Sequence, residues 1–404
     1  MTVSTIASGQ RWHELDAVRA FALLLGVALH GAMSFMSPRI WLVDDVSHST
    51  GINVLFYVIH MFRMTTFFVL AGFFARMMLQ KRGIGGFVTN RLKRIAIPLV
   101  AFWPLIMASI IAVAIVANMP APGTPAAPPP PPPALSVATF PLTHLWFLYA
   151  LLLLYTGAIV VKVITDVLHV GGVLDRLLDS VVRALTRTDM ISALLILPVA
   201  TTFYFNDHWM MWLGVMTPDT GLVPNSMAIA AFTMAFTFGW WLNRSSDLLG
   251  HLAGRTWLYG FSAVVGTALC LAMVGPSPVL MPTAGHDHLL YILIYPLTAW
   301  SWTLFLIGGA HAVLKRENPV IRYLADASYW IYVVHVPVLL GLQYAVKTID
   351  LPAELKFAGI VIATVLIALG SYAVVVRYTF IGAILNGRRR KAKADPKAKQ
   401  EVPA

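Results

Sequence analysis

The chain has 404 residues, of which 58% are hydrophobic and 12% are charged, and its formal net charge is +11. A soluble domain has about 25% charged residues, so this composition excludes a soluble globular protein. The basic residues lie in short stretches between apolar runs, which favours a role in membrane topology over nucleic-acid binding. The single cysteine, Cys270, lies inside an apolar run, so it forms no intrachain disulfide and offers no cysteine metal cluster.

The apolar runs predict an all-α, polytopic integral membrane protein. Each run has roughly the 20 residues that a helix needs to cross a bilayer core, which gives about ten transmembrane helices. In chain order they cover residues 14–36, 52–79, 92–117, 142–164, 190–205, 226–243, 256–274, 288–314, 322–344 and 355–378. The first run is long enough to span and no convincing cleavage site follows it, so we do not interpret it as a signal peptide.

The distribution of lysine and arginine predicts the orientation, because cytoplasmic loops carry an excess of both. The second, fourth, sixth and eighth loops hold most of the basic residues. The loops on the other side hold only Arg39, Lys347 and Lys356. We therefore expect both termini to be cytoplasmic.

Two segments stand apart from the predicted helices. The outer loop at about 118–141 contains an uncharged proline run, which predicts an extended polyproline spacer. Residues 386–404 form a basic tail that we expect to be disordered and cytoplasmic, so the transmembrane domain comprises residues 1–385. Within the second helix, Gly72 lies between large residues and predicts a close approach to a neighbouring helix.

Ionisable side chains inside predicted spans are the first functional candidates, because they are costly to insert into a bilayer. On the first helix, Arg19 and His30 are 11 residues apart. That spacing places them on one helix face, about 16 Å apart along the axis. Asp16 precedes Arg19 by one turn and is expected to pair with it.

Further polar residues reach the depth of His30 from other helices. His60 and Arg63 are neighbours on the second helix, and His335 lies on the ninth. His144 opens the fourth helix at the outer boundary. A single such histidine is more often a core residue bonded to a neighbouring helix. Arg63 instead needs a carboxylate, a polar cavity or an anionic ligand. Together they predict a polar cavity near the outer side, where a histidine can act as a general base.

Several stretches of the chain resemble the membrane acyltransferase-3 family. They are Arg19 with His30 on the first helix, HMFRMTTFFVLAGFFA from His60, RLKRIAIPL from Arg91, HLWFLYALL from His144 and ASYWIYVVHVP from Ala327. The HMFRM segment is most similar to the glucans biosynthesis protein C branch, which is implicated in succinylation of periplasmic glucans. The resemblance implies a multi-pass enzyme of the bacterial inner membrane. Such an enzyme takes an acyl group from cytoplasmic acyl-CoA and passes it to a sugar hydroxyl on the periplasmic side.

The resemblance also implies catalytic roles for the outer cluster. His30 matches the family's essential histidine and would be the general base, with a covalent acyl-histidine as the alternative. His60, Arg63 and His335 would orient the acceptor or stabilise the oxyanion.

At the inner side, Arg19, Arg91 and Arg94 would hold the phosphates of CoA, unless they serve only to set the topology. No metal and no permanently bound cofactor is expected. The expected partners are acyl-CoA, a periplasmic glucan or another polysaccharide, and the lipid bilayer. The oligomeric state, including a homodimer, is left open.

Three functions compete at this stage. The first is an acyl-CoA-dependent O-acyltransferase, with succinyl transfer to a periplasmic glucan preferred over acetyl transfer to another surface polysaccharide. The second is a transporter or flippase, since buried ionisable residues also mark transport pathways, although repeated halves with broken helices are not evident. A structural membrane scaffold fits the intramembrane charge cluster least well.

Overall fold

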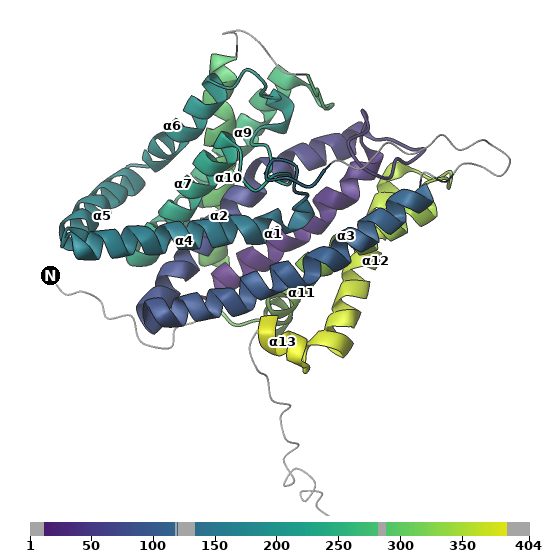
Figure 1. The fold of residues 1–404 in the computed structure, drawn as a ribbon. Helices are drawn as coiled ribbons and strands as arrows, with labels where there is room; N and C mark the ends of the chain where they lie inside the picture. The colour runs from purple at the N-terminus through teal and green to yellow at the C-terminus, as the bar shows by residue number, and fades with distance from the viewer. Residues whose placement is uncertain (1–11, 118, 120–133, 282–287, 386–404) are drawn as a thin grey trace, which may run out of the picture.

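The computed structural model describes residues 12–117, 119, 134–281 and 288–385, in which the regular secondary structure is helical apart from one isolated β-bridge between Pro141 and Thr220 (Figure 1). The helices are α1 (His13–Ala32), α2 (Thr50–Arg91), α3 (Ile97–Ala117), α4 (Trp146–Val167), α5 (Gly171–Arg187), α6 (Ile191–Tyr204), α7 (Ser226–Arg244), α8 (Leu248–Gly254), α9 (Thr256–Val274), α10 (Leu289–Val313), α11 (Pro319–Val346), α12 (Ala353–Ser371) and α13 (Phe380–Leu385). The predicted all-α class is confirmed. The proline run of the outer loop and the basic tail lie outside the described residues.

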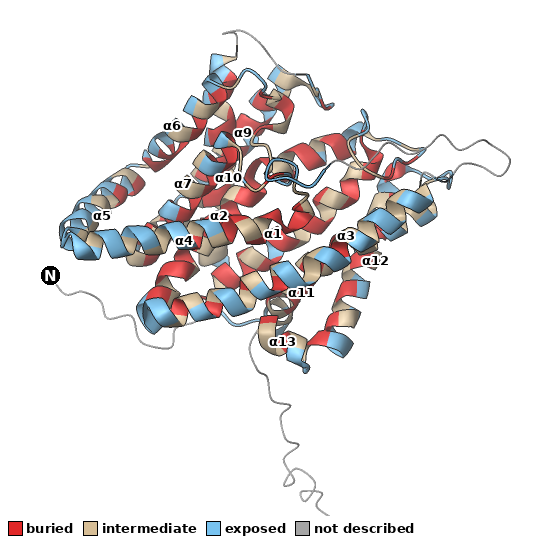
Figure 2. Ribbon diagram, viewed as in Figure 1, coloured by how far each residue is buried: buried red, intermediate tan, exposed pale blue. Residues whose placement is uncertain are grey.

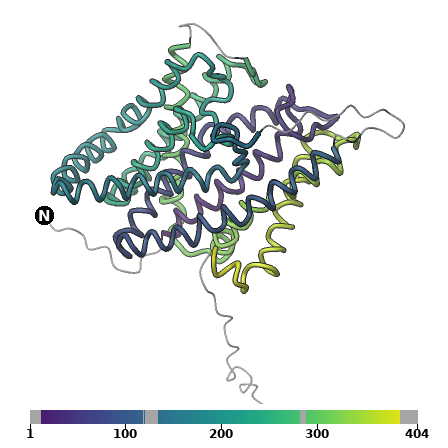
Figure 3. Tube along the Cα trace, viewed as in Figure 1, coloured from purple at the N-terminus to yellow at the C-terminus, as the bar shows by residue number. Residues whose placement is uncertain are grey.

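The described residues contain seven helical runs that are long and apolar enough to cross a membrane, or eight if the bent pair of α5 and α6 is one span. The multi-pass membrane protein predicted from composition is therefore confirmed. One of these runs, Thr50–Ala117, has 68 residues. As a straight helix it would measure about 100 Å, far more than one bilayer crossing. Figure 3 shows that the chain instead reverses direction between α2 and α3. The count of about ten spans and the cytoplasmic position of both termini remain predictions.

The reversal after α2 differs from the sequence-based prediction. We predicted that the second helix ends near residue 79, whereas the structure continues α2 to Arg91. Gly83 interrupts it with φ 65° and ψ 178°, a conformation that only glycine adopts without steric cost. Lys81, Arg82 and Arg91 therefore lie on helical turns around this bend and not in an irregular loop.

The second correction concerns the polar segment between α4 and α6. We predicted a basic loop there, and the structure forms the amphipathic helix α5. Charged residues of α5 form ion pairs with residues outside the helix: Arg183 lies 2.6 Å from Asp247, and Asp175 lies 2.6 Å from Arg244. The leucine and valine spacing of this segment already had the helical period, but its charge resembled that of a topology-setting loop.

Helix α1 lies at the centre of the bundle, where it packs on α2, α10, α11 and α12. Figure 2 shows buried residues on the inward faces of the helices and exposed residues on the outward faces of α3 and α5. Many exposed side chains are apolar, including Val100 and Leu105 on α3 and Leu366 on α12. In a membrane protein such side chains face lipid. Polar groups carried by α1 are thereby kept inside protein.

Glycines allow α2 and α7 to approach closely, as predicted for Gly72. A Cβ atom at Gly72 would lie 1.9 Å from the carbonyl oxygen of Phe236, and one at Gly239 would lie 1.8 Å from that of Val69. Both obstacles are backbone atoms, so an added methyl group can be accommodated only if the helices separate.

We expect Gly72→Ala to lower the stability of the folded protein by about 1–3 kcal/mol, the usual cost of overpacking. Thermal unfolding in detergent measures this effect. The matched control is Gly341→Ala on α11, where a Cβ atom would meet nothing within 4 Å. Equal melting temperatures for the two variants would contradict a close helix contact at Gly72.

Candidate active site

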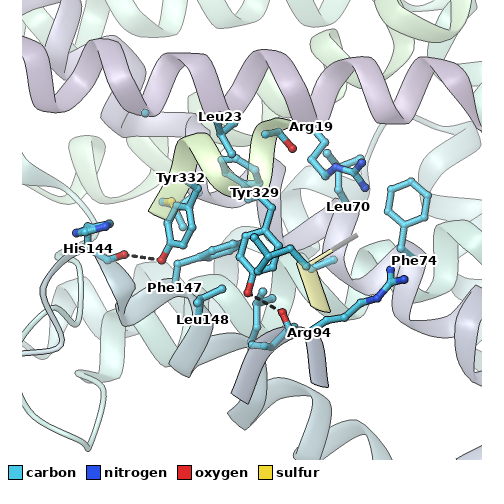
Figure 4. Close-up of a pocket in the computed structure, with 18 of the residues that line it drawn as sticks. Arg19, Leu23, Leu70, Phe74, Arg94, His144, Phe147, Leu148, Tyr329 and Tyr332 are labelled. Atoms are coloured by element: carbon cyan, nitrogen blue, oxygen red, sulfur yellow. Dashed lines mark hydrogen bonds between the residues drawn. The ribbon is translucent and has the colours of Figure 1, made fainter. Parts of the chain in front are cut away.

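A cavity of about 340 Å³ runs between α1, α2, α4 and α11. Its lining includes Arg19, Arg91 and Arg94 together with His30, Arg63, His144 and His335. Arg19 and His30 lie on α1, so the face predicted from their spacing lines one cavity over much of the helix. In Figure 4, His144 lies at one end of this cavity, while Arg19, Phe74 and Arg94 lie toward the other. We call these the histidine end and the arginine end.

The histidine end is held by hydrogen bonds that define the ring tautomers. His335 Nδ1 is 2.7 Å from the carbonyl oxygen of Tyr332, which can only accept, so the proton of His335 resides on Nδ1. Its Nε2 then accepts a hydrogen bond from His30 Nδ1 at 3.1 Å. His30 Nδ1 is also 3.0 Å from the carbonyl oxygen of Gly26. The proton of neutral His30 is therefore on Nδ1, and its Nε2 carries a free lone pair.

Arg63 on α2 brings a positive charge to the same region. Its side chain is buried and lies over Gly26, where an added Cβ atom would be 2.5 Å from Nη1. Within the described part of the chain, Arg63 forms no salt bridge and its Nε has no hydrogen-bond partner. A buried guanidinium without a carboxylate is costly unless a ligand supplies the negative charge. The region beside His30 is therefore suited to an anionic group or an oxyanion.

His144 is the third histidine of this end. It lies in the single turn Thr143–Leu145 that precedes α4, and its ring centroid is 5.1 Å from that of His335. The ring Nε2 is 3.2 Å from the carbonyl oxygen of Val333, and the hydroxyl of Tyr332 donates to the backbone oxygen of His144 at 2.7 Å. These bonds connect the start of α4 to α11.

At the arginine end, three guanidinium groups face the cavity from different elements. Arg19 forms the predicted ion pair with Asp16, at 3.0 Å, and remains partly exposed. Arg91 lies at the end of α2, with its guanidinium 4.5 Å from the ring centroid of Tyr155. Arg94 follows in the turn Leu92–Ala96, whose position is fixed by the hydroxyl of Tyr329 donating to the Arg94 backbone oxygen at 2.6 Å. Several guanidinium groups that face one cavity suit phosphate binding.

Between the two ends the wall is largely apolar and aromatic. Phe67, Phe147, Tyr329 and Tyr332 line this middle section, and Figure 4 shows Phe147, Tyr329 and Tyr332 between His144 and Arg94. An apolar middle with charged ends fits a ligand that has an anionic head and a long, weakly polar arm.

Comparison with known proteins identifies the family. The model of an acyltransferase domain, the acyltransferase-3 domain, matches residues 12–376, which is nearly the whole described chain. The chain belongs to the membrane acyltransferase-3 family. The chain is 33% identical over 97 residues to glucans biosynthesis protein C of Escherichia coli strain SMS-3-5, and 32% identical over 97 residues to that of strain K12. Each match covers 24% of this chain and 25% of the relative, so the chain spans about a quarter of the length of these curated relatives. No solved structure matches the chain.

The structure does not bring His60 into the cavity. Its Nε2 is 3.3 Å from the carbonyl oxygen of Val215, and its ring stacks on Phe56 with centroids 5.5 Å apart. His60 and Arg63 are neighbours along α2, but their side chains diverge, and His60 lines a separate small pocket toward α10. In the structure, His60 is a core histidine that is hydrogen-bonded to a neighbouring segment.

Two side chains to which our sequence analysis gave no role in the site support it. His144 was named with the outer polar residues but given no role, although the spacing of His144 and Trp146 was a usable signal. Gln343 is buried two turns beyond His335 on α11, and its amide donates to the backbone oxygens of His30 and Gly31 at 3.1 and 3.2 Å. A glutamine inside an apolar helix was the signal that could have identified it. Gln343 fixes the end of α1 that carries His30.

Proposed function

We propose that this acyltransferase moves a succinyl group from cytoplasmic acyl-CoA to a hydroxyl of a periplasmic glucan. The observation that carries the proposal is the single cavity with guanidinium groups at one end and His30 at the other. Arg91 and Arg94 lie in the basic region expected inside the cell, so the arginine end would receive the CoA phosphates. The apolar middle would hold the pantetheine arm, whose thioester would lie beside His30.

The free lone pair of His30 supports a simple acyl transfer. The acceptor hydroxyl would lose its proton to His30 Nε2 while its oxygen attacks the thioester carbonyl. Arg63 would stabilise the negative charge on that carbonyl oxygen or bind a carboxylate nearby. When the carbon–sulfur bond breaks, the CoA thiolate would take the proton from the imidazolium, which leaves an ester and neutral His30. His335 Nε2 and the Gly26 oxygen would stabilise the imidazolium through its Nδ1 proton.

Arg63 favours succinyl over acetyl as the transferred group. An acetyl group is neutral, so the positive charge of the buried Arg63 guanidinium would remain unpaired when the donor is bound. A succinyl group carries a terminal carboxylate, which can pair with a guanidinium through two hydrogen bonds. The names of the matching relatives supply the choice of a glucan as acceptor.

The experiment uses the purified full-length protein in detergent with succinyl-CoA and isolated periplasmic glucan. We expect CoA release together with a succinyl-sized mass increase on the glucan, measured by mass spectrometry. Acetyl-CoA is the parallel donor and should react more slowly. Faster acetyl transfer would indicate that acetyl-CoA, and not succinyl-CoA, is the preferred donor. Absence of CoA release with both donors would contradict an acyltransferase of this type.

A further inference from the structure

The ring of His144 has one nitrogen that nothing in the described structure uses. Its Nε2 lies beside the Val333 carbonyl oxygen, which can only accept, so Nε2 carries the proton. The Nδ1 atom is then an acceptor, and it is buried without a hydrogen-bond partner. His144 as a residue is only 7% exposed and lines the cavity with His30. A buried acceptor without a partner costs free energy that a bound donor would recover.

The backbone around His144 is held from both sides. Thr143 adopts φ 51°, which is unfavourable for a β-branched residue, and its N–H donates to the carbonyl oxygen of Asp219 at 3.0 Å. Tyr332 donates its hydroxyl hydrogen to the carbonyl oxygen of His144 itself. The ring is thus fixed at the histidine end by α11 and by the segment around Asp219. Strain next to a fixed polar ring is typical of functional positions.

We infer that His144 forms an acceptor subsite: its Nδ1 accepts a hydrogen bond from a second hydroxyl of the sugar whose reacting hydroxyl faces His30 Nε2. This inference rests on the proposed function. His30 Nε2 and His144 Nδ1 are both hydrogen-bond acceptors. They therefore suit a ligand with two hydroxyl groups and repel an anion. Arg63 is a donor at the same end and suits the acyl carboxylate or oxyanion. The two histidines would therefore bind the polyhydroxyl acceptor, while Arg63 would bind the acyl donor. His144 is accordingly a positioning residue for the acceptor and takes no part in proton transfer.

Two substitutions of His144 distinguish the roles of its two ring nitrogens, Nδ1 and Nε2. The amide of glutamine reaches the position of Nε2, so His144→Gln can keep the Val333 hydrogen bond while it removes the Nδ1 acceptor. The amide of asparagine reaches the position of Nδ1, so His144→Asn can keep the acceptor. We expect His144→Gln to raise the KM for glucan about tenfold, as expected for one lost hydrogen bond. The KM for succinyl-CoA should rise by a smaller factor than the KM for glucan, because the proposed hydrogen bond of His144 is made only to the acceptor.

The full-length protein is assayed in detergent with succinyl-CoA, using isolated glucan and then methyl β-glucoside and its monodeoxy analogues. His144→Asn should recover most of the acceptor affinity, and His208→Asn, an exposed histidine between α6 and α7, is the matched control. In the wild type, at least one analogue that lacks a non-reacting hydroxyl should show a raised KM, and His144→Gln should abolish that difference.

Three results would overturn the inference. One is an acceptor KM for His144→Gln close to that of wild type, and another is an equal rise in the KM for glucan and the KM for succinyl-CoA, which indicates a folding role. The third is equal KM values for all monodeoxy probes on the wild type, a test that needs no variant. These failures leave CoA release by the wild-type protein intact. A wild-type protein that releases no CoA would instead end the proposed function and this inference with it.

Discussion

Replacement of His30 by alanine should reduce acyl transfer to the background rate. Its Nε2 carries a free lone pair, because the proton of neutral His30 lies on Nδ1, and His30 lines the cavity together with Arg63. Loss of a general base typically costs a factor of about 10²–10⁴ in rate. CoA release and glucan succinylation by the purified variant measure the loss, and thermal unfolding shows whether the variant is folded.

The His30 variant has a stringent control in His335→Ala. His335 touches only the Nδ1 side of His30, so its loss should weaken the orientation of the base and cost less than loss of the base itself. His60→Asn should lower activity least of these substitutions, because His60 lies outside the cavity. Full activity of a folded His30→Ala protein would end the catalytic assignment. A labelled acyl group trapped on His30 after rapid quenching would favour the acyl-histidine alternative over general-base catalysis.

The sequence predicted the parts of the site that depend on one helix. The spacing of Arg19 and His30 defines a face of α1, and the structure places both along one cavity. The pair of Asp16 and Arg19 depends on a single helical turn, and it forms as predicted. Such relations follow from helix geometry alone and do not need the tertiary fold.

Relations between helices were less predictable. His60 and Arg63 are adjacent on α2, yet only Arg63 reaches the cavity, because three residues still differ by about 60° in direction around the helix axis. Arg63 points toward α1, and His60 points toward α10. His144 joins the site through a turn whose backbone depends on Asp219, far away in the sequence. In a span that is apolar on every side, the hydropathy pattern gives the depth of a residue but not its direction around the helix axis. The amphipathic helix α5 was missed for a different reason, since its charge pattern resembled that of a topology-setting loop.

Replacement of Arg63 by alanine should separate function from stability. The guanidinium is buried, lacks a carboxylate partner in the described structure, and lies inside a membrane-spanning helix. Its removal abolishes an insertion cost of a few kcal/mol, so the folded protein should be at least as stable as wild type. Succinyl transfer should fall about a hundredfold, because a buried ionic contact to the donor or oxyanion is lost. Melting temperature and turnover are measured on the same detergent preparation.

The donor preference distinguishes the two roles of Arg63. If its guanidinium binds the succinyl carboxylate, Arg63→Ala should lose succinyl transfer far more than acetyl transfer; if it binds only the oxyanion, both should fall equally. Gly26→Ala tests the same contact from α1, since its Cβ atom would lie 2.5 Å from Nη1 of Arg63 and must displace a flexible side-chain end. That displacement should reproduce the donor preference of Arg63→Ala in a folded protein. Parallel losses of expression and turnover in both variants would instead assign Arg63 to packing, and the cavity would then lack its proposed anion site.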